Sequence, residues 1–231
     1  LSGGVRPIPL SVATARSMLD LPVDERHTFM QYWQSQALQL ARYLQVDCIR
    51  MRVLLARHTL KPRRPPRLGD VSLRIERDAV EYRGIGGVLR DLASDYRRDD
   101  YILVANAAQL LLMPLPSLAL ELSNAGNGQA ADVSLISHHE GTPGGLMLIR
   151  CGSLLSIPEL GYVDMKEQAL SSIAQDHRVR VVRPSQLTAI PVRTASDYLS
   201  AVRWRHRQMS EQETGCANNP FGEDWRPTFR I

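Results

Sequence analysis

Aromatic residues are scarce in this sequence of 231 residues, at 6% of the total. Proteins that bind single-stranded nucleic acid stack bases on aromatic rings, so this scarcity argues against such a role. The formal net charge of +4 is mildly basic. That charge suits a phosphorylated ligand, but it is far below the charge density of a dedicated nucleic-acid binder. We therefore expect no nucleic-acid partner.

Cysteines and long apolar runs are also lacking. The three cysteines, Cys48, Cys151 and Cys216, lie far apart with no paired spacing. This excludes a disulfide framework or a zinc site and fits a reducing cytoplasm. No apolar run is long enough to cross a bilayer, so we expect no membrane contact. The sequence opens at Leu1 with no signal-peptide pattern, and we expect the biological start to lie elsewhere.

Common catalytic signatures are missing as well. Neither a Gly-x-Ser-x-Gly elbow nor a P-loop occurs, so hydrolase and kinase functions have no support. His138 and His139 stand next to Glu140, but adjacent residues on a strand point to opposite faces. Without a third spaced ligand, these histidines do not predict a metal site.

Apolar residues make up 44% of the chain and charged residues 23%, as in globular proteins. Hydrophobic periodicity alternates between strand and helix along the chain. Strands are predicted at 48–56, 71–75, 101–105, 132–137, 144–150 and 178–182, and helices at 25–44, 88–96, around 115–122, at 164–174 and at 196–209. The alternation predicts a three-layer α/β/α sandwich with a mostly parallel central sheet. The continuous apolar run 101–105 indicates a strand buried in a parallel sheet.

Several shorter segments carry local signals. Asp24 is the predicted cap of the helix 25–44, and Asp164 with Glu167 three residues later has capping-box spacing. Residues 60–69 mix arginines, a lysine and prolines, which predicts a basic surface loop. The glycine-rich residues 1–4 look like the exit of a strand whose body is absent, and residues 215–231 look like a polar tail.

Five motifs follow one another in a fixed order over residues 1–203. They are LSGGVRPIPLS (1–11), RSMLDLPV (16–23), YRGIGGVL (82–89), the strand segment 101–111 and SDYL (196–199). In this order and spacing they resemble the sugar-phosphate nucleotidyltransferases, whose fold is the Rossmann-like nucleotide-diphospho-sugar transferase fold. The resemblance implies a nucleotidyltransferase-like domain at 1–209 and a linker at 210–231. Family members often continue into a β-helix, which this sequence does not contain.

The resemblance also implies a reaction and a set of site residues. A sugar-1-phosphate attacks the α-phosphorus of a nucleoside triphosphate and pyrophosphate leaves, usually with magnesium. Arg6 and Lys166 are the catalytic candidates, and Asp164, Lys166 and Glu167 are the candidates for the sugar phosphate. The nucleotide-binding candidates are Gly3, Gly4, Arg6, Arg16, Gly84, Gly86, Gly87 and Asn106. We expect a cytoplasmic homo-oligomer that binds a nucleoside triphosphate or nucleotide sugar and a sugar-1-phosphate.

The metal ligands of that family are not matched. Its two metal-binding aspartates correspond to Ala108 and Pro191, neither of which can ligate magnesium through its side chain. Arg16 replaces a lysine, keeping charge but not geometry. The acidic residues considered as substitutes are Asp132, Glu140, Asp164 and Glu167. We therefore identify no protein ligand for a metal.

Two functions remain open from the sequence. The first is nucleotidyl transfer to a sugar-1-phosphate, in full or degenerate form. The second is a non-catalytic nucleotide-sugar-binding subunit with a regulatory or scaffold role, and a pure assembly domain with a vestigial pocket is a further variant. Each of these residues also has an interpretation that involves no ligand: Asp164 as a helix cap, Lys166 as an exposed helix lysine, and Gly84 to Gly87 as a helix-entry turn.

Overall fold

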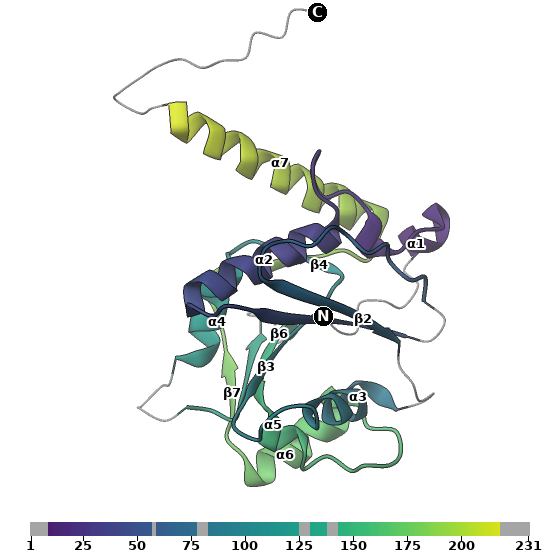
Figure 1. The fold of residues 1–231 in the computed structure, drawn as a ribbon, viewed down its shortest axis with the longest axis vertical. Helices are drawn as coiled ribbons and strands as arrows, with labels where there is room; N and C mark the ends of the chain where they lie inside the picture. Colours follow the sequence, from purple (N-terminus) through teal and green to yellow (C-terminus); the bar gives the residue numbers. More distant parts are fainter. Residues whose placement is uncertain (1–8, 57–58, 78–82, 125–129, 138–142, 218–231) are drawn as a thin grey trace, which may run out of the picture.

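The computed structural model describes residues 9–56, 59–77, 83–124, 130–137 and 143–217, with side chains up to residue 210. Strands run through the middle of the molecule, and helices cover them on two sides (Figure 1). One helical layer contains α2 (Phe29–Leu44) and α4 (Leu115–Ser123). The other contains α3 (Gly84–Ala93) and α6 (Leu170–Asp176). The predicted α/β sandwich is confirmed.

The largest sheet has four strands in the order β3-β6-β5-β7. They are β3 (Tyr101–Ala105), β6 (Pro143–Arg150), β5 (Val133–Ser137) and β7 (Val179–Val182). β6 is antiparallel to both neighbours and β5 is parallel to β7, so three of the four strands point the same way. The sheet is mostly parallel in strand direction, as predicted. The strand 101–105 is buried only at Val104 and Ala105, and its ladder with β6 is antiparallel rather than parallel.

Two smaller pairs of strands complete the sheet layer. β1 (Ile49–Leu55) and β2 (Val71–Arg77) pair in parallel, with Ile49 opposite Val71. β4 (Gln109–Leu111) and β8 (Ala189–Pro191) form a short antiparallel pair. Both β1 and β2 fall at predicted positions. β4 and β8 were not predicted, because three-residue strands are too short to show a period.

The start of α2 differs from the prediction. Thr28, not Asp24, is the N-cap: its hydroxyl accepts the N–H of Gln31, whose side chain accepts the N–H of Thr28 in return. The Asp24 carboxylate instead accepts the backbone N–H of His27 at 2.8 Å. The helix therefore begins at Phe29, four residues later than predicted, because a complete capping box outcompetes a single acceptor.

The other helices lie near their predicted positions with shifted ends. α3 begins at Gly84, inside the predicted glycine turn. The predicted helix 164–174 is a π-helical turn, η3 (Met165–Ala169), followed by α6. α7 (Ala195–Ala217) is longer than predicted and crosses the proposed boundary at 209/210, so the division into domain and linker stays a prediction. The short elements are α1 (Pro9–Thr14), η1 (Met18–Asp20) and α5 (Cys151–Leu154).

The buried apolar side chains form two clusters on opposite sides of the strands. The first joins α2 and α4 to the sheet around Trp33 and Leu118. The second lies under α3 and α6 around Leu89 and Ile173. The indole N–H of Trp33 donates to the carbonyl oxygen of Ala107 at 3.2 Å, so the first cluster also fixes the segment that follows β3.

α7 is fastened to the amino-terminal segment by two side chains. The hydroxyl of Tyr198 donates to the carbonyl oxygen of Pro22 at 2.7 Å, and the guanidinium of Arg205 contacts the carboxylate of Asp24 at 3.2 Å. These bonds place the carboxyl-terminal helix over residues near the start of the chain. None of the described helices combines the length and the hydropathy that a bilayer span requires.

Candidate functional site

Two of the described site candidates lie just beyond the carboxyl ends of strands. Asn106 follows β3, and Gly84 opens α3 shortly after β2 ends at Arg77. In open α/β sheets ligands bind beyond the carboxyl ends of the strands, so these two positions are where a site is expected. Three further candidates, Gly3, Gly4 and Arg6, lie outside the described residues.

The turn after β3 is held by its own polar groups. The Asn106 side-chain oxygen accepts the N–H of Ala108 at 2.9 Å, and the Asn106 N–H donates to the carbonyl oxygen of Gly145 at 2.8 Å. The buried amide of Gln109 donates to the same carbonyl at 3.2 Å. Asn106 therefore shapes the turn, and its nucleotide-binding role stays a prediction. Gln109 was missed, because nothing in the sequence shows that this amide is buried.

The two positions that correspond to metal ligands are neighbours in space. Val192 donates its N–H to the carbonyl oxygen of Ala108 at 2.9 Å, and Gln109 lies opposite Pro191 in the β4–β8 pair. The side chains of Ala108 and Val192 are buried in the first apolar cluster, at 5% and 0% exposed. The structure thus brings close together the two positions that motif spacing singled out.

Magnesium does not fit the residues at these positions. Alanine, proline and valine offer no side-chain oxygen, and a hard cation needs carboxylate, carbonyl or water oxygens. In the part of the chain that the structure describes, no three His, Cys, Asp or Glu side chains group as a metal site requires. We therefore derive no chemical step through a metal.

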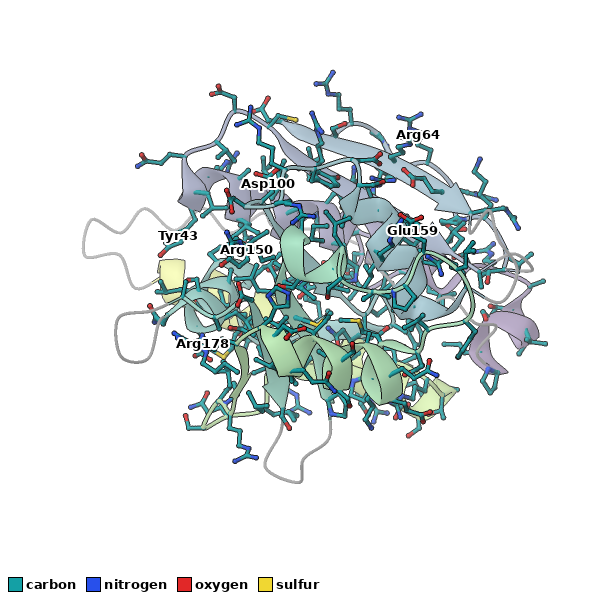
Figure 2. All side chains as sticks on the ribbon, turned by 90° about the horizontal axis from the view of Figure 1, so that it is seen from below. Tyr43, Arg64, Asp100, Arg150, Glu159 and Arg178 are labelled. Carbon is teal, nitrogen blue, oxygen red and sulfur yellow. The ribbon has the colours of Figure 1, made fainter. Side chains whose placement is uncertain are left out.

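Asp132, one of the residues considered as a substitute ligand, lies at the amino ends of the parallel strands, opposite the end where Asn106 lies. It precedes β5, at the amino end of that strand, and its carboxylate contacts Arg150 at 3.3 Å and accepts the N–H of Arg178 at 3.0 Å. Burial would raise the pKa of Asp132, but these donors lower it overall. Figure 2 shows Arg150 and Arg178 well apart from Glu159, which precedes the other candidates. Glu140 lies outside the described residues.

The Gly84 turn packs against residues near position 163. Gly86 donates its N–H to the carbonyl oxygen of Val163 at 3.0 Å, and Val163 donates to the carbonyl oxygen of Arg83 at 3.0 Å. The structure therefore brings the predicted nucleotide turn into contact with the segment that leads into the predicted sugar-phosphate residues. Sequence alone gave no reason to join these two segments.

Each glycine of this turn also has a packing reason. Gly84 has φ +71°, and a Cβ there would lie 2.3 Å from the carbonyl oxygen of Val163. A Cβ on Gly86 would lie 3.0 Å from that oxygen, and one on Gly87 would lie 2.9 Å from the Arg83 side chain. The helix-entry interpretation therefore accounts for the three glycines, and their contact with a nucleotide stays a prediction.

Arg83 stabilises the Gly84 turn, although nothing in the sequence distinguishes it from the other arginines. Its guanidinium is buried, makes two 2.9 Å hydrogen bonds to the carboxylate of Asp91, and donates to the carbonyl oxygen of Gly161 at 2.8 Å. The hydrogen bond from Arg83 lowers the pKa of Asp91. This cation is committed to the protein itself, so it fixes the turn rather than serving a phosphate.

Asp164 is a helix cap, as its interpretation without a ligand predicted. Its carboxylate accepts the N–H groups of Lys166 and Glu167 at 2.8 and 2.9 Å. The return bond, however, runs from the Asp164 N–H to Gln168 rather than to Glu167. The first turn is π-helical and wider than an α-turn, which moves the returning side chain one position along. Lys166 and Glu167 are exposed, and their sugar-phosphate roles stay predictions.

Arg16 lies with the basic loop rather than in either turn. It is exposed, and its charge acts on Asp20, which also accepts the N–H of Arg63 at 2.8 Å. The amide of Gln34 donates to the carbonyl oxygen of Pro66 at 3.4 Å and holds the far part of the loop to α2. Residues 60–69 thus form a mostly exposed loop, and the nucleotide-binding role of Arg16 stays a prediction.

Comparison with known proteins identifies the fold. No family model matches the sequence, and no curated protein does. A candidate glucose-1-phosphate thymidylyltransferase of Bacillus anthracis, solved with sucrose, is 12% identical, with a TM-score of 0.57 and coverage of 83% of this chain and 87% of that one. HddC of Yersinia pseudotuberculosis, solved with GMP-PN, is 12% identical, with a TM-score of 0.52 and coverage of 87% and 95%.

A third solved structure, the inositol-1-phosphate CTP transferase of T. maritima, is 8% identical, with a TM-score of 0.50 and coverage of 77% and 84%. These similarities span most of this chain and most of each neighbour. At such low identity they establish the fold, which is that of the nucleotide-diphospho-sugar transferases, as the sequence motifs predicted.

Proposed function

We propose that this protein is nucleotidyltransferase-like and binds a nucleoside triphosphate or nucleotide sugar, together with a sugar-1-phosphate, at the carboxyl ends of β2 and β3. The observation that carries the proposal is the contact between the Gly84 turn and Val163, made by the Gly86–Val163 hydrogen bond. It joins the predicted nucleotide segment to the predicted sugar-phosphate segment. The fold, shared with proteins solved with sucrose and with GMP-PN, supports the same ligands.

The proposed reaction transfers a nucleoside monophosphate. A phosphate oxygen of the sugar-1-phosphate bonds to the α-phosphorus, the bond from that phosphorus to the bridging oxygen breaks, and pyrophosphate leaves with the electron pair. The protein has to align two anions and to balance their charge. Lys166, exposed beside the Asp164 cap, is the proposed mobile cation for the sugar phosphate. Arg6 and Arg16 are the proposed cations for the triphosphate.

The second candidate is a non-catalytic subunit that binds the nucleotide sugar. The side chains at the two positions matched to metal ligands, buried Ala108 and exposed Pro191, favour it, since they offer no carboxylate to balance the charge of a triphosphate. Binding of a nucleotide sugar, which carries less charge, makes a smaller demand on the site. Both functions use the same binding site, and only the transferase releases pyrophosphate.

Calorimetry and a pyrophosphate assay separate the two functions. Each nucleoside triphosphate and several nucleotide sugars are titrated into the full chain, and pyrophosphate release is then followed with sugar-1-phosphates, with and without magnesium. Binding with release supports the transferase, and binding without release supports the non-catalytic subunit. If no nucleotide or nucleotide sugar binds at millimolar concentration, both proposals are wrong.

Lysine labelling tests the placement of the site. The sequence contains two lysines, Lys61 and Lys166, and both are exposed. We expect the tightest-binding nucleotide sugar to slow acetylation of Lys166 while leaving Lys61 unchanged, as measured by mass spectrometry. Lys166→Gln should weaken binding, with Lys61→Gln as the matched control. Equal effects at the two lysines would remove Lys166 from the site.

We also propose that the protein is cytoplasmic and homo-oligomeric. Cys48 and Cys151 are free thiols, which supports a reducing compartment. Sedimentation velocity of the full chain checks the oligomeric state. Magnesium, which the resemblance implies, is not part of the proposal because the residues present do not fit it.

A further inference from the structure

A proline-rich segment, residues 60–68, runs between the parallel strands β1 and β2. Such strands are usually joined by an α-helix, but these residues adopt neither helix nor strand. The three prolines each fix φ at about −65°, and Lys61 and Arg64, which precede prolines, are restricted to extended backbone. We therefore expect a polyproline II conformation, with three residues per turn and a rise of about 3.1 Å per residue. We call residues 60–68 the strap.

One side of the strap packs against the protein. Pro62 is buried, and Pro65 and Leu68 are partly buried. These positions are three residues apart, so a polyproline II segment places them on one side. The burial pattern thus agrees with the conformation that the prolines predict.

Hydrogen bonds hold the strap against η1 and α2. The backbone N–H of Arg63 donates to the carboxylate of Asp20 in η1 at 2.8 Å. The side-chain amide of Gln34 in α2 donates to the carbonyl oxygen of Pro66 at 3.4 Å. Because the backbone is already fixed, a partner that binds the outer side chains does not have to order it.

Three cations share the outer side of the strap. They are exposed and recur at every third residue. A polyproline II backbone presents such residues on one side, about 9 Å apart. We call this set the cationic row, and it consists of Lys61, Arg64 and Arg67.

The charge of the cationic row is not used within the protein. Among the described residues, no carboxylate forms an ion pair with the row. Glu76 on the adjoining strand β2 is paired instead with Arg52 and Arg74, at 2.7 Å each. The guanidinium of Arg64 donates to the carbonyl oxygen of Leu73 at 3.4 Å, which leaves its other N–H groups for a partner.

The prolines themselves are not the surface that a partner reads. Pro62 and Pro65 have the Pro-x-x-Pro spacing that aromatic-lined grooves recognise in polyproline II ligands. Such a groove has to contact both prolines, whereas Pro62 is buried in the protein itself. The side of the strap that a partner can reach is therefore the cationic row.

We propose that the cationic row binds an extended acidic segment of another protein, whose carboxylates are about 9 Å apart. Arginine bonds a carboxylate through two parallel N–H groups, and lysine adds a mobile point charge. A partner in the same conformation as the strap, with an acidic residue at every third position, brings one carboxylate to each cation. The interaction is electrostatic, so it weakens as salt rises.

The spacing of the row favours an acidic peptide over other anions. Duplex DNA carries one charge per about 1.7 Å of its axis, which is far denser than one cation per about 9 Å. The strap also has no aromatic side chain on which a base could stack. Clusters that bind anionic lipids contain about four to eight Lys or Arg residues. Arg63, the fourth cation of the strap, lies on a different side from the row, so only three cations face one way.

The first test compares two labelled peptides of the same composition. One repeats Glu-Pro-Pro four times, which places its carboxylates about 9 Å apart on one side. The other joins four consecutive glutamates to eight prolines, so its charge is concentrated at one end. Fluorescence anisotropy with the full chain at about 50 mM salt measures both affinities. We expect the repeat peptide to bind about threefold tighter or more, although charge density alone favours the block peptide.

The second test removes the row. Lys61→Gln combined with Arg64→Gln and Arg67→Gln should weaken binding of the repeat peptide about tenfold, since each exposed ion pair contributes modestly. The control removes three exposed cations elsewhere, so its net charge is the same, and it should change binding less than about twofold. Its substitutions are Arg97→Gln, Arg98→Gln and Arg207→Gln. Arg97 lies beside Asp100, which Figure 2 shows well apart from Arg64.

Two neighbouring arginines of the strap give the sharpest comparison. Arg63 and Arg64 are both exposed, but only Arg64 belongs to the row. Arg64→Gln should weaken binding of the repeat peptide about threefold, and Arg63→Gln should have a smaller effect. The peptide measurements need no nucleotide, and the row contains none of the residues proposed to bind nucleotide or sugar phosphate. Their outcome is therefore independent of the proposed function.

Four results would overturn the proposal. Failure of both peptides to bind at millimolar concentration means that the row does not bind acidic peptides. Equal or tighter binding of the block peptide means that the spacing is not recognised. Equal losses in the row variant and its control mean that net charge alone is responsible. Tighter binding of duplex DNA or of phosphatidylserine vesicles, lost in the row variant, assigns the row to a nucleic acid or a membrane. If the row variant does not fold, the single variants at Arg63 and Arg64 decide.

Discussion

The backbone N–H of Val192 donates a hydrogen bond to the carbonyl oxygen of Ala108 at 2.9 Å. Ala108 precedes β4 and Val192 follows β8, and these two strands are far apart in the sequence. Val192 adjoins Pro191, which the family resemblance matches, together with Ala108, to metal ligands. The side chains of Ala108 and Val192 are both buried and apolar. They thus contribute apolar packing, and neither can ligate a metal ion.

Restoring a carboxylate at this place should cost stability. Ala108→Asp buries an ionised group in an apolar cluster, and we expect the free energy of unfolding to fall by about 2 kcal/mol or more. Urea denaturation measures the change. Ala195→Asp, an exposed alanine in the first turn of α7, is the control and should be neutral or slightly stabilising. Equal effects of the two substitutions would contradict the burial argument.

The double variant Ala108→Asp with Pro191→Asp tests the metal argument itself. Pro191 is exposed, so its replacement should be tolerated better than that of Ala108. We expect manganese binding, followed by calorimetry, only when both carboxylates are present, since one carboxylate alone holds a divalent ion weakly. Absence of binding in a folded double variant would mean that these two positions cannot together form a metal site.

Asp24 and Asp20 should show opposite pH dependence. Burial would raise the pKa of Asp24, but N–H donors and the neighbouring His27 and Arg205 lower it below 3.8. Its stabilisation is therefore present above pH 3.8 and is lost as pH falls through the folded pKa. Burial raises the pKa of Asp20. That residue therefore costs stability as pH rises from 3.8 through its folded pKa.

Urea denaturation of Asp24→Asn and Asp20→Asn at pH 3 and pH 6 checks these signs. We expect Asp24→Asn to lose more stability at pH 6 than at pH 3. Asp20→Asn should be relatively more stable at pH 6 than at pH 3, because the cost of the buried charge is removed. The prediction fails if both variants change in the same direction between the two pH values.

Gly84→Ala should destabilise the protein more than Gly161→Ala. Both glycines have positive φ, +71° and +90°, so either alanine pays about 1–2 kcal/mol of backbone strain. Only at Gly84 would the new Cβ also collide with the carbonyl oxygen of Val163, while nothing lies within 4 Å of Gly161. Thermal or urea unfolding measures the difference, and equal losses would show that the turn moves to accommodate the methyl group.

Thr28→Ala should cost about 1 kcal/mol, because it removes the capping box of α2. Thr14→Ala is the matched control, since the Thr14 hydroxyl only bonds the Leu10 carbonyl within a short exposed helix. Urea denaturation compares the two. A loss at Asp24→Ala with none at Thr28→Ala would restore the original assignment of the cap.

The sequence predicted elements whose signal is local. The strand 101–105 was located exactly, since five apolar residues lie between charged and polar ones. The cap of α2 was misplaced because Asp24 and Thr28 both fit a cap pattern and only hydrogen bonding distinguishes them. β4 and β8 depend on a pairing between distant segments, which no local window contains.

The same limit applies to the site. Motif spacing identified Ala108 and Pro191 as related positions, and the structure makes them neighbours. The roles of Arg83 and Gln109 depend on burial, and burial follows from tertiary packing rather than from residue type. Buried polar residues that hold a turn in place by hydrogen bonds are therefore the residues that sequence reasoning is least able to identify.

The hydrogen bonds between α7 and the amino-terminal segment affect how the protein folds during its synthesis. Tyr198 and Arg205 bond Pro22 and Asp24 across 176 and 181 residues of chain. A ribosome releases the first of these partners long before the second is synthesised. These contacts can therefore form only after α7 has been synthesised, and contacts between such remote positions slow folding.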